Sequence, residues 1–185
     1  MTTWHNHPAG LATTRGQIGS RNMSTVAYSE KAKLALTAGG DQPIRLWNLE
    51  TGMPVRDLAA SDYAHACFSP NGKRVAGIYN ELLRLWDVET GKVLFGLDGV
   101  KAFCVAFSPD GKRLVTGGRD KMQVWDANGK ELHKYEGHAG SVGCVMFFPD
   151  GKHIASTDFD GLSNPASGPG SPGFDRTVRI WRAPR

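Results

Sequence analysis

The stretch VAFSPDGKRLVTGGRDKMQVWD, residues 105–126, decides the fold of this chain. Apolar residues alternate with others on both sides of Asp110-Gly111. Asp-Gly between two such runs is a strong hairpin signal, because the turn needs a positive φ that glycine adopts at little cost. We therefore predict two antiparallel strands here, a second turn at residues 117–120, and a third strand that ends at Trp125.

Closely similar segments occur four times along the chain. They are VAYSEKAKLALTAGGDQPIRLWN (26–48), ACFSPNGKRVAGIYNELLRLWD (66–87), the stretch above, and VMFFPDGKHIASTDFD (145–160), continued by RTVRIWR (176–182). Such a regular recurrence indicates repeated supersecondary units, each too small to bury its own apolar face, so neighbouring units must stack. A third turn at 89–92 precedes a short fourth strand at 93–95. Four antiparallel strands per unit is the pattern of a propeller blade.

These residues resemble the WD40-repeat β-propeller family. The resemblance is carried by FSPDG at 107–111, Trp86-Asp87, Trp125-Asp126, DVETGK at 87–92 and Gly137-His138. It implies an all-β chain of about four WD-type repeats, each a four-stranded antiparallel blade. Because the family usually has seven blades, we expect an open or partial propeller.

The resemblance also divides the chain. Residues 1–20 are interpreted as a closing strand or the remnant of a preceding blade. Blades 1 to 4 are expected at 21–60, 61–97, 98–136 and 137–185. Blade 4 lacks an outermost strand and carries a Gly/Pro/Ser-rich insert at 161–175, interpreted as a tolerated surface loop or a partner-contacting loop. The chain is therefore expected to be a fragment of a longer propeller or to pair with another copy.

The resembled family forms a buried, hydrogen-bonded tetrad within a repeat, from a histidine, a serine or threonine, an aspartate and the tryptophan. Blade 4 matches the full set with His138, Ser156, Asp160 and Trp181. Blade 2 departs most, with Asn80 in place of the aspartate and Gly77 near the hydroxyl position. His138, Ser156 and Asp160 also superficially resemble a nucleophilic triad, but a triad needs a serine exposed to substrate. We expect these side chains inside, in a structural role.

The sequence lacks the motifs typical of catalytic and cofactor sites. His5 and His7 could begin a metal site, yet no further ligand is spaced to complete it. The chain has no Gly-x-x-x-x-Gly-Lys-Ser/Thr phosphate loop, no Gly-x-Ser-x-Gly turn and no Cys-x-x-Cys-His. We therefore predict no enzyme activity, no cofactor and no metal.

Net charge and cysteine content indicate which kind of partner and which cellular compartment to expect. The net charge is +4, and the basic residues are scattered rather than gathered in one block, which favours solubility over a polyanion site. The three cysteines suggest no disulfide framework, and no apolar run is long enough for a secretory signal or a bilayer span. We expect a reducing compartment, the cytoplasm, and no membrane association.

What remains is binding. In the resembled family, partners dock on the face that bears the loops into the first strand and between the second and third strands. The candidates at those loops are Asp62, Tyr79, Lys101, Phe103, Arg119 and Phe159. The prediction is a noncatalytic scaffold for a protein or peptide partner, with self-association to complete a ring as a further possibility. The alternatives are a nucleic-acid-binding propeller segment and a truncated fragment without independent function.

Overall fold

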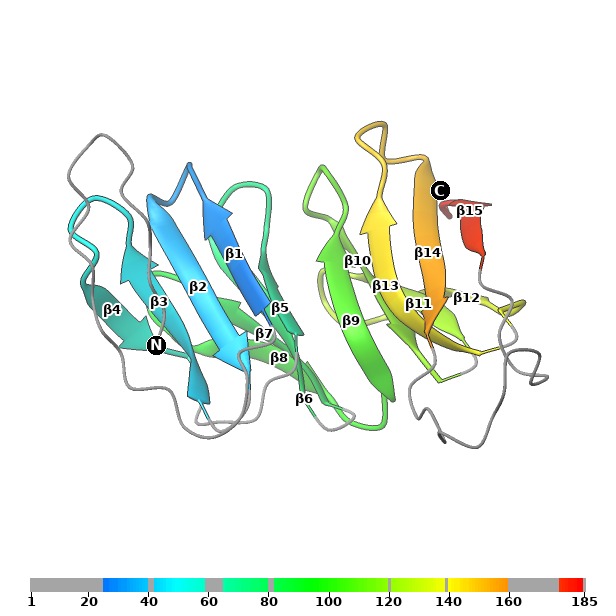
Figure 1. Ribbon diagram of the computed structural model, residues 1–185, viewed down its shortest axis with the longest axis horizontal. Coiled ribbons are helices and arrows are strands. Elements are labelled where there is room, and N and C mark those ends of the chain that lie inside the picture. Colours follow the sequence, from blue (N-terminus) through cyan, green and yellow to red (C-terminus); the bar gives the residue numbers. More distant parts are fainter. Residues whose placement is uncertain are drawn as a thin grey trace.

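The computed structural model describes residues 25–39, 42–58, 65–79, 82–119, 121–138, 140–159 and 177–184. These residues form β-strands and turns and no helix, in four antiparallel sheets (Figure 1). The predicted N-terminal segment, the insert at 161–175 and the candidates Asp62 and Asp160 lie outside the described residues. The domain boundaries stay predictions.

Each sheet is a meander in which every strand pairs with the next along the chain. Sheet 1 contains β1 (Thr25–Ser29), β2 (Leu34–Gly39), β3 (Gln42–Asn48) and β4 (Pro54–Asp57). Sheet 2 contains β5 (His65–Phe68), β6 (Arg74–Tyr79), β7 (Leu82–Asp87) and β8 (Val93–Leu97). Sheet 3 contains β9 (Ala102–Phe107), β10 (Arg113–Gly118), β11 (Met122–Asp126) and β12 (Glu131–Tyr135). Sheet 4 contains β13 (Ser141–Phe147), β14 (His153–Phe159) and β15 (Val178–Arg182).

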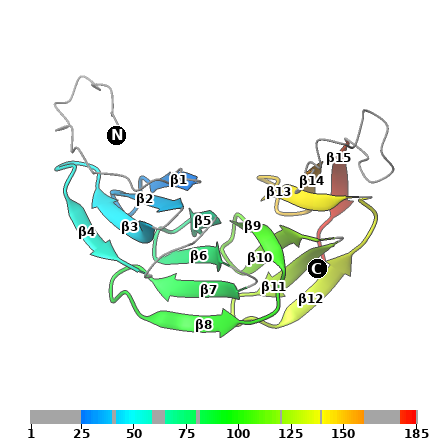
Figure 2. The same cartoon turned by 60° about the horizontal axis from the view of Figure 1, so that its bottom comes forward.

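The four sheets stand side by side in an open arc (Figure 2). The first strands β1, β5, β9 and β13 line the inside of the arc, and β4, β8 and β12 lie on its outside. Successive first strands contact one another, but sheets 1 and 4 stand at the two ends. The predicted open, partial propeller of antiparallel blades is confirmed.

The turn that the sequence marked at Asp110-Gly111 joins β9 to β10. Gly111 has a φ of 68°, and its N–H donates to the Ser108 carbonyl at 2.8 Å. The Asp110 carboxylate accepts from the Ser108 hydroxyl at 2.6 Å and from the Lys112 N–H at 3.0 Å. The Asp110 side chain thus accepts a hydrogen bond from a backbone N–H that the tight turn leaves without a backbone partner.

One predicted turn is placed differently. Gly117 and Gly118 belong to β10, where Gly117 pairs with both Cys104 and Met122, so the reversal comes only after Gly118. The reason is space. A Cβ added at Gly117 would lie 2.5 Å from Val142 Cγ1 of sheet 4, so the glycine permits close packing of neighbouring sheets rather than the turn.

The core consists of three apolar clusters, one at each junction between neighbouring sheets. Trp86 of sheet 2 packs with residues of sheet 1, Trp125 of sheet 3 with sheet 2, and Trp181 of sheet 4 with sheet 3. Each of these three tryptophans therefore faces the preceding sheet. Stability comes from junctions rather than from any single sheet, as expected of stacked repeats.

Candidate functional site

A buried polar group lies inside sheet 4. Ser156 of β14 accepts a hydrogen bond from the Trp181 indole N–H at 2.7 Å, and its hydroxyl lies 2.7 Å from His138 Nε2. His138 precedes β13 and is buried, and Ser156 is 1% exposed. The structure thus brings three of the four predicted tetrad residues together, while Asp160 lies outside the described residues.

The same hydroxyl-to-indole contact recurs in two other sheets. Trp47 donates to Thr37 at 2.9 Å in sheet 1, and Trp125 donates to Thr116 at 2.9 Å in sheet 3. In sheet 2 the matching position, two residues after the partner of the tryptophan, is Gly77, which carries no hydroxyl. A contact repeated in this way supports an architectural role, because a buried indole N–H is costly without an acceptor. Ser156, enclosed here, cannot present its oxygen to a substrate.

Lys101 and Arg119 meet at one edge of sheet 3. Lys101 precedes β9 and Arg119 follows β10, and the Arg119 N–H donates to the Lys101 carbonyl at 3.3 Å. Between them, a Cβ added at Gly118 would lie 1.9 Å from that same carbonyl, so only glycine permits the approach. Both charged side chains are exposed. Two cations therefore project from adjacent loops.

The other predicted contact residues are less completely placed. Phe103 is half-buried in β9, at an irregularity opposite Gly117 and Gly118. Tyr79 ends β6 opposite Leu82, and Phe159 ends β14 opposite Ser141, although their side chains lie outside the described part. Tyr79 and Phe159 are the last residues of the second strands of sheets 2 and 4, and Arg119 directly follows the second strand of sheet 3, so all three lie at the same end of their sheets. We call this side of the arc the loop edge.

A cleft that the sequence did not reveal lies between sheets 3 and 4, on the side opposite the loop edge. Its volume is about 590 Å³, and its lining comprises Asp110, Lys112, Arg113, Gly151, Lys152, Arg182, Ala183 and Pro184. Four of these side chains are cationic and one is a carboxylate. The Gly-Lys pairs at 111–112 and 151–152 could have indicated the lysines of this cleft from the sequence. That residues 182–184 complete the lining depends on tertiary structure.

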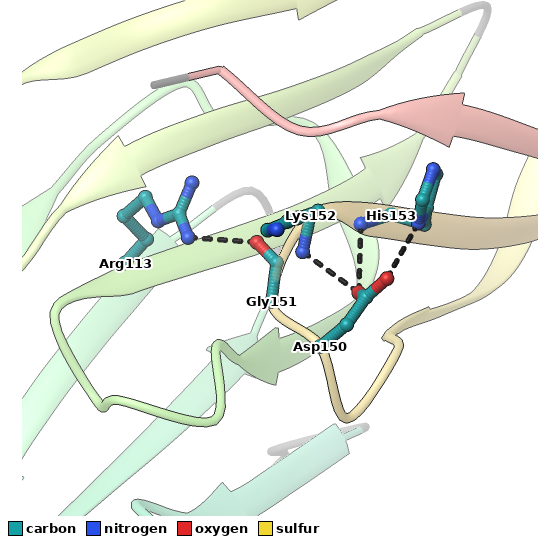
Figure 3. Close-up of polar contacts among 5 residues, drawn as sticks. All are labelled: Arg113, Asp150, Gly151, Lys152 and His153. Carbon is teal, nitrogen blue, oxygen red and sulfur yellow. Dashed lines mark hydrogen bonds and ion pairs between the residues drawn. The ribbon is translucent and has the colours of Figure 1, made fainter.

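Two sets of polar contacts organise this cleft (Figure 3). Arg113 donates to the Gly151 carbonyl at 2.9 Å and to the Pro184 carbonyl, and so ties sheet 3 to sheet 4. Asp150 accepts from the Lys152 N–H at 2.8 Å and contacts His153 Nδ1 at 2.7 Å. The backbone bond from Lys152, followed by the His153 contact, holds the pKa of Asp150 below its ordinary value. The cleft can accept an anionic group, with Arg113 already engaged.

The thiols occupy different environments. Burial raises the pKa of Cys67 and of Cys104 to about 12, which disfavours the nucleophilic thiolate. Cys144 is exposed on sheet 4. Within the described residues, no three side chains of His, Cys, Asp or Glu gather as metal ligands would, and no helix could span a membrane.

Comparison with known families agrees with this geometry. The family model described as "WD domain, G-beta repeat" matches residues 92–126 and 129–164. These two ranges are WD40 repeats. The first matched range runs from β8 of sheet 2 through β11 of sheet 3, so one WD40 repeat links neighbouring sheets. WD40 repeats generally serve as platforms for protein interactions. A search of curated proteins found no match.

Proposed function

We propose that this WD40-repeat chain is a noncatalytic scaffold that binds a protein or peptide through the loop edge. The observation that carries the proposal is the pairing of Lys101 and Arg119. Their backbones are joined by a hydrogen bond, which fixes the two loops, while both side chains remain exposed. Fixed loops that present charged groups need little ordering on binding, which favours affinity.

The chemistry of this edge indicates the kind of partner. Two neighbouring cations favour a segment that carries carboxylates, and arginine can bind a carboxylate through two parallel hydrogen bonds. Phe103 lies two residues after Lys101 in the chain. Aromatic residues and arginine are enriched among the interface residues that contribute most of the binding free energy. The partner we propose is therefore an acidic peptide or protein surface.

Differential capture tests the proposal. The immobilised chain is compared with Lys101→Glu/Arg119→Glu and with a charge-matched control, Lys92→Glu/Lys130→Glu, which changes exposed lysines in turns on the other side of the arc. The amount of each protein captured by wild type and control should fall about tenfold or more with the loop-edge variant, because two attractive charge pairs become repulsive. Equal capture by all three proteins would remove the loop edge as the binding surface.

The noncatalytic part of the proposal has a separate test. Ser156 is enclosed and bonded to Trp181 and His138, so an activity-directed fluorophosphonate should leave it unlabelled in the folded protein. Labelling of Ser156 in the native chain would contradict this assignment. The free thiols of Cys67, Cys104 and Cys144 support a reducing, cytoplasmic setting, which we include in the proposal.

A second candidate function is nucleic-acid binding, favoured by the four cations of the cleft between sheets 3 and 4. Phosphate contacts release counterions, so affinity for duplex DNA would fall steeply as salt is raised. Binding that weakens with salt and is lost in Lys112→Glu/Lys152→Glu, while the loop-edge variant binds normally, would favour this second function over the first.

A further inference from the structure

The outer face of sheet 4 exposes apolar residues whose equivalents are buried everywhere else. Val178 and Ile180 precede Trp181 by three residues and one residue, and they are 68% and 65% exposed. The residues at the same two positions before Trp47, Trp86 and Trp125 are at most 1% exposed: Ile44, Leu46, Leu83, Leu85, Met122 and Val124. We call this surface, with Cys144 and Met146 of β13, the trailing face.

Sheet 1, at the other end of the arc, exposes apolar residues of its first strand whose equivalents in the other sheets are more buried. Val26 is 62% exposed and Tyr28 is 71% exposed. The residues that match Val26 are Ala66, Val105 and Val145, and none exceeds 5% exposure. Of the residues that match Tyr28, Phe147 is 7% exposed and Phe68 and Phe107 are half-buried. We call the surface of Val26 and Tyr28 the leading face.

The junctions inside the arc show what each of these faces packs against. At every junction, residues equivalent to Val178 and Ile180 pack against the next sheet, which contributes its tryptophan and the residues equivalent to Val26 and Tyr28. Leu83 and Leu85, for example, lie in one cluster with Val105 and Trp125. The chain thus builds one kind of interface three times. One half of that interface is exposed on sheet 1 and the other half on sheet 4, the two sheets at the ends of the arc (Figure 2).

We propose that the trailing face of one copy of this chain packs against the leading face of a second copy. A second copy fits both ends, because it carries the complementary half that each end lacks. Such an interface is head-to-tail rather than self-complementary, so each copy uses two different surfaces. The proposal concerns surfaces other than the loop edge and stands independently of the partner-binding function.

The mass of the full chain in solution is the first test. Sedimentation velocity over a range of protein concentrations should give a mass of two or more 20.0 kDa chains for the wild type. Ile180→Glu on the trailing face and Val26→Glu on the leading face should each give the single-chain mass, because each places a charge in an apolar interface. Leu94→Glu, which changes an exposed residue on the outer strand of an internal sheet, is the control and should behave as wild type.

Mixing the two variants tests the direction of packing. The Val26→Glu copy keeps an intact trailing face, and the Ile180→Glu copy keeps an intact leading face, so the mixture should associate although neither variant does so alone. Circular dichroism should show unchanged strand content in both, since the substituted residues are exposed. A wild-type monomer at every concentration, an assembly that neither variant affects, or a mixture that stays monomeric would overturn the proposal.

Cys144 supplies a readout that does not depend on mass. Its equivalent, Cys104, is buried at the junction of sheets 3 and 4, whereas Cys144 is exposed on the trailing face. Alkylation of Cys144 should slow at least about tenfold as protein concentration rises through the association range. In Ile180→Glu the rate should not depend on concentration. A wild-type rate that is equally independent of concentration would contradict the proposed interface.

Discussion

Ser156 shows how one buried atom can order a whole sheet. Its oxygen is shared by the Trp181 indole and the His138 imidazole, which come from β15 and from the loop before β13. Removing this hydroxyl leaves the partly buried Trp181 indole N–H without its acceptor, and an unpaired buried group costs more than the hydrogen bond gains.

We expect Ser156→Ala to lower the free energy of unfolding by about 1–3 kcal/mol. Chemical denaturation followed by tryptophan fluorescence measures the change. Ser156→Thr is the matched control, because threonine occupies the equivalent positions Thr37 and Thr116 and accepts the same indole bond there. A loss in the threonine variant as large as that in the alanine variant would argue against the hydrogen bond as the cause.

The turn aspartates make stability depend on pH. The Ser108 hydroxyl bond, with help from the Lys112 N–H, lowers the pKa of Asp110 from its ordinary value of 3.8. Backbone donors likewise lower the pKa of Asp87, Asp126 and Asp150. A carboxyl whose pKa is lower in the folded state stabilises the fold above its unfolded pKa, and that contribution is lost as pH falls through the folded value.

The thermal midpoint of the wild type should therefore fall as the pH is lowered below about 4. Asp110→Asn should show a shallower fall, because an amide does not titrate. The chain contains its own precedent: Asn71 accepts from the Ser69 hydroxyl at 2.7 Å and from the Lys73 N–H at 3.0 Å in the equivalent turn. Identical acid profiles for the two proteins would show that Asp110 contributes nothing to acid sensitivity.

At the scale of strands and turns, the sequence predicted the hairpin turns at Asp-Gly and Asn-Gly but not the positions of the irregularities in strand register. Asp-Gly and Asn-Gly located the turns because those residues impose the backbone conformation themselves. The register shift between Gly117 and Gly118 could not be predicted in this way, since it depends on Val142 and the Lys101 carbonyl, which reach these glycines from elsewhere in the fold. Local chemistry is visible in a sequence, whereas close approach between distant segments is not.

Gly117 offers a direct test of such an approach. A Cβ there would lie 2.5 Å from Val142 Cγ1 and 2.9 Å from both Cys104 Sγ and Val145 Cγ1. We expect Gly117→Ala to destabilise the protein by about 1–3 kcal/mol, because the junction between sheets 3 and 4 must open to admit the methyl group. Urea denaturation provides the measurement.

Gly96→Ala is the control for Gly117→Ala. Gly96 also lies within a strand, β8, but its added Cβ would come no closer than 3.5 Å to Arg84, an ordinary contact. This variant should be neutral or slightly more stable, because alanine restricts the unfolded chain. Equal destabilisation at both positions would point to a general intolerance of alanine in strands instead of crowding at the junction.

For the whole molecule, the repeat predicted the arc but not every surface on it. The four similar segments of the sequence were enough to predict stacked units. The basic cleft was missed because it forms where residues 182–184 reach the turn before β10, as in the contact between Arg113 and Pro184, which are 71 residues apart in the chain. The local sequence also does not distinguish Cys144 from Cys104, because the two segments are similar and only Cys104 has a sheet packed over it.

The open arc also predicts how stability is distributed. Sheets 2 and 3 each pack against a neighbour on both sides, whereas sheets 1 and 4 each share one junction within the described chain. Opening an end sheet breaks one apolar cluster, and opening an inner sheet breaks two. Amide hydrogen exchange should therefore be slower, by at least about tenfold (~1.4 kcal/mol), at inner sheets than at end sheets. The amides to compare occupy one register position: Leu36, Ala76, Val115 and Ala155. The exchange is measured on the Ile180→Glu variant, so that association between copies does not protect the end sheets. Equal protection at all four amides would mean that the arc unfolds as one cooperative unit.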